Sequence, residues 1–278
     1  MTALGRTAQK FAASALPLLL LLAFAFFSAS PIPAVRASDF SAPHAHRGVV
    51  DPFRPGDPKV KLDGGARSVL GSGRPYQAQI RSGSSSGRGL VVQDVDAPTE
   101  CVWSRILDYD HYSDMVPRTV ESQNYEVVQH KPSKKNPLER TIYTRMKVGF
   151  PMIKLEFFVR HMHYPSLRSL TWTLDYTKKS DLDDSCGYWY VIPHPDDPDR
   201  RTRVYYSVQV SMFDWAPKFV VDFMSSRALT DATGWVKKYS ELEWAKDPRK
   251  REMDRAAAEA EAEAEALALA ARARAASS

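Results

Sequence analysis

The chain of 278 residues is long enough for one domain of ordinary size with extensions, or for two small domains, and carries a formal net charge of +5. That positive excess lies before residue 89, because residues 89–244 hold 20 basic and 22 acidic side chains. The central part therefore lacks the basic character of a nucleic-acid-binding protein, and we expect no nucleic-acid partner. Cys101 and Cys186 form no metal-type spacing; we expect two small buried hydrophobic residues, with a single disulfide as the alternative.

The first 37 residues have the pattern of a secretory signal. The first ten contain Arg6 and Lys10 and no acid, and residues 11–27 are almost wholly apolar. As a helix this apolar run would span roughly 25 Å, slightly less than the hydrocarbon core of a bilayer. We therefore predict a cleaved signal peptide over residues 1–37, with a signal-anchor as the alternative.

Residues 38–88 form a basic segment rich in Gly, Pro and Ser. Around its start, Ala37-Ser38-Asp39-Phe40-Ser41-Ala42-Pro43 resembles the signature of two-part targeting sequences in algae whose plastid lies inside the endomembrane system. The segment shows neither helical nor strand periodicity, so we predict a disordered basic linker or transit segment. The expected compartment is the plastid of such an alga, with processing near residue 88. A secreted or membrane-anchored protein is the alternative.

Residues 89–244 have regular hydrophobic patterns that predict a single domain. Residues 90–96 are predicted as a strand, and Pro98 then opens a short helical region that ends at Pro117. Six further strands are predicted over residues 120–129, 138–148, 153–164, 168–176, 186–192 and 202–212. Their apolar and polar residues alternate, which predicts an antiparallel sheet with one buried face and one face in water. The residues expected on the buried face include Thr144, Met146, Phe157, Val159, Trp172, Leu174, Tyr206 and Val208.

The last predicted element of this domain is a long helix over residues 217–244. Pro217 suits the first helical position, where its missing N–H costs nothing. Apolar residues then recur at steps of three and four, which puts them on one face of a helix. These residues are Val221, Met224, Ala228, Ala232, Trp235, Tyr239 and Leu242. A helix with such a face must bury it, and we expect it to lie across the sheet.

Local motifs support a family resemblance over residues 89–244. They are Val95-Asp96-Ala97-Pro98-Thr99-Glu100, Trp103, Leu107-Asp108-Tyr109, Tyr112, Met115-Val116-Pro117, Val120-Glu121-Ser122, Trp189, Thr202 and Trp215-Ala216-Pro217. In this order they resemble the START-like superfamily, specifically its polyketide-cyclase and coenzyme-Q-binding branch. The resemblance implies an α+β helix-grip fold: a curved antiparallel sheet of about seven strands wrapped around a long C-terminal helix, with short helices after the first strand. Ubiquinone-binding members carry Trp-Cys after the proline, whereas Arg118-Thr119 follow Pro117 here, which argues against ubiquinone itself.

This resemblance also implies a cavity between the sheet and the long helix. Its inward residues are apolar and aromatic, which suits a lipid, an isoprenoid quinone or a pigment. We therefore predict that the protein binds and transfers, or chaperones, a hydrophobic ligand at a membrane surface, with no cofactor and no metal. The predicted ligand-binding residues are Tyr109, Tyr112, Met115, Pro117, Met146, Phe150, Phe157, Trp172, Tyr188, Tyr190, Tyr206, Phe213, Trp215, Phe219, Phe223 and Met224.

Two other functions stay open. A polyketide cyclase or dehydrase would need only one or two polar side chains in the cavity, such as Tyr188, Tyr190 or Tyr206. A non-catalytic protein-interaction module at a membrane is the other. We predict no enzyme activity, because the sequence contains neither a Gly-rich phosphate loop nor a nucleophile elbow. His161 and His163 share one face of a strand without a partner at metal-ligand spacing, so we expect them to be structural.

Two predictions concern the ligand entrance and the C-terminal tail. The loops at 115–117 and 213–216 contain large apolar residues where polar ones are usual. The family resemblance implies that these loops meet near Phe219 and Phe223, so we expect the ligand entrance there, where exposed aromatic rings can insert into a membrane interface. Residues 245–278 are charged and rich in Ala and Glu, which predicts a helical or disordered tail outside the core.

Overall fold

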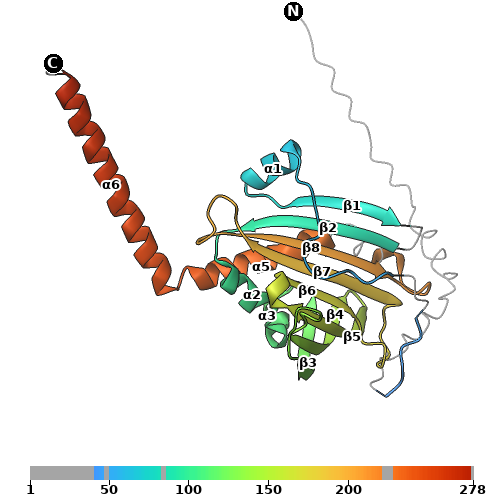
Figure 1. Cartoon of the computed structure of the whole chain (residues 1–278). Helices are drawn as coiled ribbons and strands as arrows, with labels where there is room; N and C mark the ends of the chain where they lie inside the picture. The colour runs from blue at the N-terminus through green and yellow to red at the C-terminus, as the bar shows by residue number, and fades with distance from the viewer. Residues whose placement is uncertain (1–40, 47–49, 83–85, 221–227, 277–278) are drawn as a thin grey trace, which may run out of the picture. The chain divides into compact units, whose positions relative to one another are not determined.

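The computed structural model describes residues 41–46, 50–82, 86–220 and 228–276 (Figure 1). The chain divides into two units, Met1–Val35 and Arg36–Ser278, and all described residues belong to the second unit. The predicted signal peptide and the first part of the targeting motif therefore lie outside the described residues.

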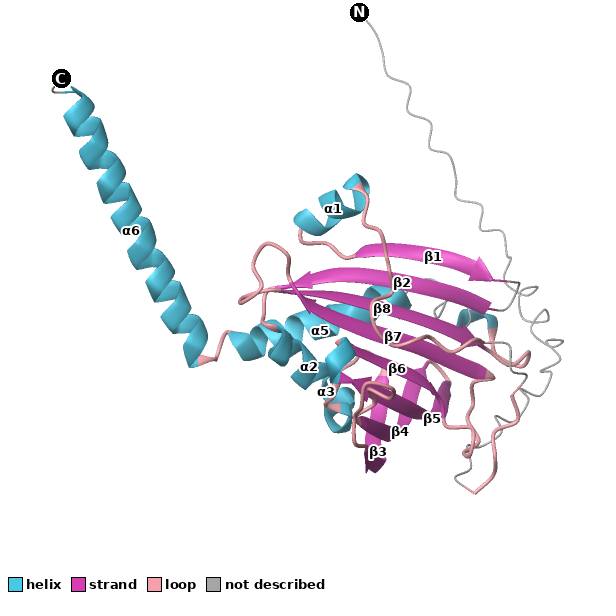
Figure 2. Ribbon diagram, in the orientation of Figure 1, coloured by secondary structure: helices cyan, strands magenta, loops and turns pink. Residues whose placement is uncertain are grey.

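One antiparallel sheet organises the second unit (Figure 2). Its strands are β1 (Tyr76–Ser82), β2 (Ser86–Val95), β3 (Thr119–Gln129), β4 (Arg140–Phe150), β5 (Ile153–Tyr164), β6 (Ser169–Leu174), β7 (Asp184–Pro193) and β8 (Thr202–Ser211). The spatial order of these eight strands is β1-β2-β8-β7-β6-β5-β4-β3. The sheet is thus open, with β1 and β3 at its edges. All of the predicted strands are present, and β1 is an addition to them.

Cross-strand pairs place the predicted buried residues on one face, which we call the inner face. Thr144 lies opposite Val159, and Met146 lies opposite Phe157. Val159 in turn lies opposite Leu174. Directly opposed residues in an antiparallel pair project to the same side of the sheet. The register therefore confirms the predicted alternation in β4, β5 and β6.

Short helices after β2 pack against the inner face (Figure 2). They are α2 (Thr99–Ile106), the 3-10 turn η1 (Tyr109–His111) and α3 (Tyr112–Met115). Pro98 caps α2 and fits there because the first turn of a helix needs no N–H donor from proline. Val102 and Ile106 of α2 are fully buried. This arrangement confirms the predicted fold class, in which short helices follow the first long strand.

The C-terminal helix of the domain is described as α5 (Ala228–Trp244). Its Trp235 and Val236 belong to the same core as α2. Residues 218–220 are also helical, whereas residues 221–227 lie outside the described residues. One residue of the predicted apolar stripe is not buried: Leu242 is 48% exposed, whereas Ser240 is fully buried. The buried face of α5 is therefore rotated slightly from the predicted stripe.

The opposite face of the sheet, which we call the outer face, is also covered over β1, β2, β7 and β8. The chain before β1, including α1 (Gly64–Gly71), lies on it. A buried cluster here consists of Leu70, Val92, Tyr188 and Tyr205, with Phe53, Val60, Leu62, Tyr76, Tyr190 and Ile192 packed against it. Phe53 meets Tyr188 edge-on, with ring centroids 4.9 Å apart. The prediction that this face lies in water is therefore wrong in this region.

The same contacts correct the prediction of disorder for residues 38–88. β1 pairs with β2 over seven residues. Further upstream, the His44 backbone N–H donates to the Tyr176 carbonyl oxygen at 2.9 Å, and His44 Nε2 donates to the Asp183 carbonyl oxygen at 2.9 Å. The described part of this segment is thus an irregular strap with one helix and one strand. An irregular strap has no fixed period, so its apolar residues could not be told from those of a linker.

The C-terminal tail is helical as α6 (Pro248–Ala276). Its large apolar residues Leu267 and Leu269 are 65% and 69% exposed. Near its start, Arg249 Nη1 lies 2.8 Å from Glu100 Oε1 of α2. No helix among the described residues combines the length and the apolar character needed to cross a membrane.

Candidate functional site

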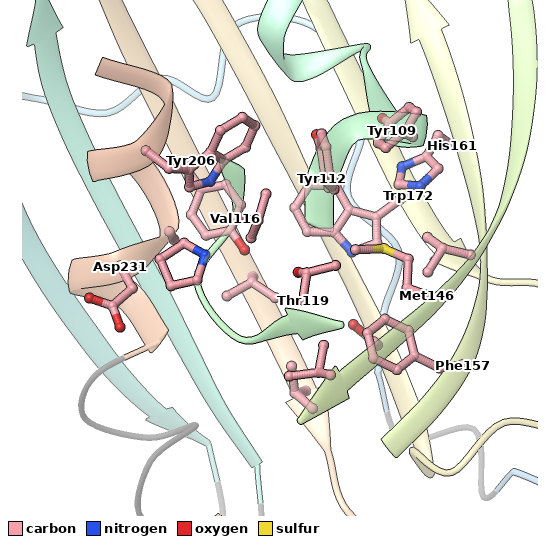
Figure 3. Close-up of a pocket in the computed structure, with 18 of the residues that line it drawn as sticks. Tyr109, Tyr112, Val116, Thr119, Met146, Phe157, His161, Trp172, Tyr206 and Asp231 are labelled. Carbon is pink, nitrogen blue, oxygen red and sulfur yellow. The ribbon is translucent and has the colours of Figure 1, made fainter. Parts of the chain in front are cut away.

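A cavity of about 220 Å³ lies between the inner face, the turn after α2 and helix α5 (Figure 3). Its lining is mainly apolar and aromatic. The lining residues are Tyr109, Tyr112, Val116, Pro117, Thr119, Met146, Val148, Phe157, Val159, His161, Trp172, Leu182, Ser185, Trp189, Tyr206, Val208, Val210, Asp231, Ala232 and Trp235. The sheet supplies most of these side chains because every second residue of β4 to β8 projects to the inner face.

Aromatic rings in contact with one another form the walls of the cavity. Tyr206 of β8 stacks on Trp172 of β6 with ring centroids 5.6 Å apart, and it meets Trp189 of β7 at 4.4 Å. On the helical side, Tyr112 and Trp235 meet edge-on at 4.9 Å. Rings packed in these tilted and stacked arrangements hold one another in place. The cavity therefore has aromatic walls on both the sheet side and the helix side.

The position of Trp172 depends on a glycine in the neighbouring strand. Trp172 lies directly opposite Gly187 of β7. A Cβ atom at position 187 would overlap the Trp172 ring and the Ser207 carbonyl oxygen. The indole can approach β7 this closely because position 187 carries no side chain.

Polar groups are few, and two of them meet in the part of the cavity formed by η1 and β5. Figure 3 shows Tyr109 and His161 side by side, with Asp231 on the other side of the cavity. The Tyr109 and His161 rings stack with centroids 4.1 Å apart. The Tyr109 hydroxyl and both ring nitrogens of His161 are buried and have no hydrogen-bond partner among the described residues. By contrast, the Tyr112 hydroxyl donates to the Ile106 carbonyl oxygen at 2.5 Å.

Burial sets the protonation of these groups at neutral pH. It lowers the pKa of His161 to about 3, so the imidazole is neutral. It also raises the pKa of Tyr109 and of Tyr206 well above the usual value, so both phenols keep their protons. Asp231 is the one acidic residue among the described lining residues, and it lies on α5. Across the described residues, no group of three or more His, Cys, Asp or Glu side chains could hold a metal ion.

Seven of the predicted ligand-binding residues line the cavity. They are Tyr109, Tyr112, Pro117, Met146, Phe157, Trp172 and Tyr206. Met115 instead lies in the main core, where its sulfur is 3.9 Å from a guanidinium nitrogen of Arg105. Phe223 and Met224 lie outside the described residues.

Tyr188 and Tyr190 are on the wrong side of the sheet for the role predicted for them. Both belong to the outer-face cluster beneath the N-terminal strap. Between them, Trp189 projects to the inner face, where it lies opposite Tyr206. The sequence prediction missed Trp189, Trp235 and His161 as cavity residues.

The predicted entrance residues lie beside the cavity. Phe213 and Trp215 stack with centroids 6.2 Å apart. Trp215 and Phe150 pack against a second core cluster, which contains Leu155, Leu174, Leu182, Met212 and Val220. Phe219 is 41% exposed. Trp215 and Phe150 therefore help to close this end of the sheet, while Phe219 faces solvent.

Comparison with known sequences decides the family. Residues 95–234, half of the chain, match the family described as polyketide cyclase/dehydrase and lipid transport. The chain belongs to this family. No curated protein sequence matches this chain.

Solved structures similar to this family member come from several bacteria. A START superfamily protein from Mycobacterium smegmatis is 15% identical, with 56% of this chain and 97% of that protein covered and a TM-score of 0.42. The Zhui aromatase/cyclase from a Streptomyces species is 14% identical, with 60% and 94% covered and a TM-score of 0.40. A STAR-related lipid transfer protein from Xanthomonas axonopodis is 9% identical, with 59% and 98% covered and a TM-score of 0.40.

Proposed function

We propose that this protein binds a hydrophobic small molecule, such as a lipid, an isoprenoid quinone or a pigment, and transfers or chaperones it. The observation that carries the proposal is the cavity of about 220 Å³ with aromatic walls between the inner face and α5. Such a concave, mainly apolar site with few polar groups is typical of small-molecule binding. Membership of a family that includes lipid transport supports the same function.

The size of the cavity limits the ligand. Its volume of about 220 Å³ is below the range of roughly 300–1,000 Å³ that is typical of sites for drug-sized molecules. A small ring system or a short chain would fit within the described lining, and a longer molecule would extend beyond it. Each buried CH2 group contributes about 0.8 kcal/mol, so roughly ten of them reach the free energy of a micromolar complex.

A cyclase or dehydrase is the second candidate function. His161 and Tyr109 favour it, because a proton-transfer catalyst needs such groups beside its substrate. The pKa of about 3 makes His161 a weak base at neutral pH, however, and catalytic bases work best when their pKa is near the working pH. We therefore keep binding as the first proposal.

Purification of residues 38–278 from native cells is expected to yield the protein with an apolar molecule bound. Mass spectrometry of an organic extract would identify that molecule. Adding it back to the stripped protein at about 100 times its Kd should stabilise the fold by about 2.7 kcal/mol, which raises the Tm by roughly 5–10 °C. An extract without any apolar molecule, together with no Tm rise across a panel of lipids, quinones and pigments, would contradict the proposal.

We further propose that the protein meets a membrane through the end of the sheet beside the cavity. Two exposed apolar side chains lie there, Met152 at 93% and Phe219 at 41% exposed. Met152 is at the tip of the β4–β5 hairpin, whose residue Phe150 packs against the same cluster as Trp215. Exposed apolar residues grouped at one end of a molecule are typical of membrane contacts. The N-terminal signal would bring the protein to the endomembrane system, and we propose the plastid as its destination.

Replacing both Met152 and Phe219 by Ser is expected to weaken binding to phosphatidylcholine vesicles by roughly tenfold or more, because inserting one Phe side chain alone contributes about 1.5–3 kcal/mol. Co-sedimentation with vesicles would measure the change. Val127→Ser is the matched control, since Val127 is 49% exposed but lies on edge strand β3. Equal binding by the double variant and the control would place any membrane contact elsewhere.

A further inference from the structure

Tyr109 and His161 line an otherwise apolar part of the cavity, and their hydrogen-bonding atoms are buried in its wall (Figure 3). His161 is 6% exposed and Tyr109 is 1% exposed. Within the described ranges, no protein atom hydrogen-bonds to either imidazole nitrogen of His161 or to the Tyr109 hydroxyl. Buried polar groups are nearly always hydrogen-bonded, so groups without a protein partner at a cavity wall indicate a partner from outside the chain.

The surrounding groups do not offer that partner. The next histidine on the strand, His163, is engaged: Arg140 Nε donates to its Nδ1 at 3.2 Å. The Tyr112 hydroxyl already donates to the Ile106 carbonyl oxygen. Trp172 faces His161 through its ring, with centroids 6.5 Å apart. The free hydrogen-bonding capacity in this part of the cavity therefore belongs to Tyr109 and His161.

The protonation of the two side chains decides which chemical group can pair with them. A neutral imidazole offers one N–H donor and one acceptor nitrogen, and a phenol offers one donor and one acceptor. His161 is neutral at neutral pH because burial lowers its pKa to about 3. Neither residue carries a charge, and the Arg140 guanidinium beside Tyr109 bonds to His163 instead, so an ionised carboxylate or an ammonium group would be buried here without a directly bonded counter-charge, at high cost. A hydroxyl or a carbonyl oxygen matches the pair without that cost.

We propose that the ligand carries an uncharged hydroxyl or carbonyl oxygen on an apolar body, and that this oxygen bonds to His161, Tyr109 or both. The inference rests on the proposed function, in which the cavity binds a hydrophobic small molecule. It narrows the ligand class to molecules that combine an apolar ring or chain with a neutral oxygen. Pure hydrocarbons and ligands whose charged group must be buried at this point are excluded.

Two probes of nearly equal shape test the inference. 2-Naphthol and 2-methylnaphthalene differ only in a hydroxyl against a methyl group, and both are small enough for a cavity of about 220 Å³. The affinity of residues 38–278 for each probe would be measured by fluorescence titration at pH 7. The quantity of interest is the ratio of the two affinities, compared between the wild-type protein and its variants, since this comparison cancels the hydration of the probes.

Two variants are informative. Tyr109→Phe removes only the hydroxyl, and His161→Phe replaces the imidazole by an apolar ring. One hydrogen bond to a buried group is worth about 1–3 kcal/mol when it is lost. We therefore expect the naphthol preference to fall by about tenfold in at least one of them. Tyr205→Phe is the matched control: it removes a tyrosine hydroxyl from the outer-face cluster, away from the cavity, and should leave the ratio unchanged. Thermal unfolding would verify that each variant is folded.

The outcomes separate the two proposals. The inference would be overturned if the ratio of the two probe affinities were the same in the wild-type protein, in Tyr109→Phe, in His161→Phe and in the double variant. The polar pair would then not recognise the ligand. In that case, binding of 2-methylnaphthalene by the wild-type protein would still support the proposed apolar site. If the wild-type protein binds neither probe, the inference fails, whereas the proposed function is decided by the organic extract and the Tm panel.

Discussion

Removing residues 38–88 from the mature chain is expected to destabilise the domain by about 5 kcal/mol or more. The deletion uncovers Val92, Tyr188 and Tyr205, which are 0%, 6% and 8% exposed when the N-terminal strap covers them. Exposing one large apolar side chain costs about 1.5–3 kcal/mol, so the three side chains together approach the total stability of an ordinary domain. The loss of the β1–β2 ladder adds to this and makes β2 an edge strand.

Urea unfolding of residues 38–278 and 89–278 would measure the difference. A chain that ends at residue 255 is the matched control, because it removes the exposed part of α6 while keeping Asp254, whose carboxylate pairs with Arg200. This control should unfold at nearly the same urea concentration as the full chain. Equal midpoints for residues 89–278 and 38–278 would show that the strap contributes nothing to stability.

The same contacts bear on how the precursor is processed. Cleavage after Ala37 would keep His44, α1 and β1 in the mature protein, whereas cleavage near residue 88 would remove all three. We therefore revise the predicted cleavage near residue 88 and propose that the mature chain begins before His44. N-terminal sequencing of the protein from its native cells would find a start between residues 38 and 44. A start near residue 88 would contradict this proposal.

Elements with a strict hydrophobic period could be predicted from the sequence. β5 runs from Ile153 to Tyr164, as predicted, because Leu155, Phe157 and Val159 alternate with residues that are polar except for the buried Phe158. The N-terminal strap could not be predicted in this way. Its residues Phe53, Val60 and Leu62 pack against the outer face of the sheet at irregular intervals along the chain. Their burial depends on contacts with distant strands, so no local sequence pattern predicts it.

Periodicity also failed to predict which residues of β7 line the cavity. In β7 the inner-face residues Trp189 and Val191 alternate with Tyr188 and Tyr190, so both faces are apolar and periodicity does not distinguish them. Pairing with β8 decides which alternate residues face the cavity, because Trp189 lies opposite Tyr206. His161 did carry a signal: it lies two residues after Val159 and therefore on the face predicted to be buried. What the sequence could not show is that its nitrogens lack a partner among the described residues.

Replacing Gly187 by Ala is expected to destabilise the domain by about 3 kcal/mol and to weaken ligand binding. The new methyl group would overlap the Trp172 ring and the backbone carbonyl oxygen of Ser207, so the indole must move into the cavity and β7 must shift from β8. Overpacking of this kind costs about 1–3 kcal/mol, and the upper end applies because a backbone atom is involved. A displaced indole would also occupy part of the 220 Å³ that the ligand needs.

Urea unfolding and titration with 2-methylnaphthalene would measure both effects on the same protein. Gly234→Ala is the control glycine, because a Cβ atom there has no neighbour within 4 Å and the position is exposed on α5. That change should stabilise the helix by up to about 1 kcal/mol and leave probe binding unaltered. A second change, Trp172→Leu, should restore part of the stability lost in Gly187→Ala, since the smaller side chain leaves room for the methyl group. The stability effects of two substitutions in contact are not additive.

If Gly187→Ala retains both wild-type stability and wild-type probe affinity, then the position of Trp172 does not depend on the absence of a side chain at position 187. Another group would then form this wall of the cavity.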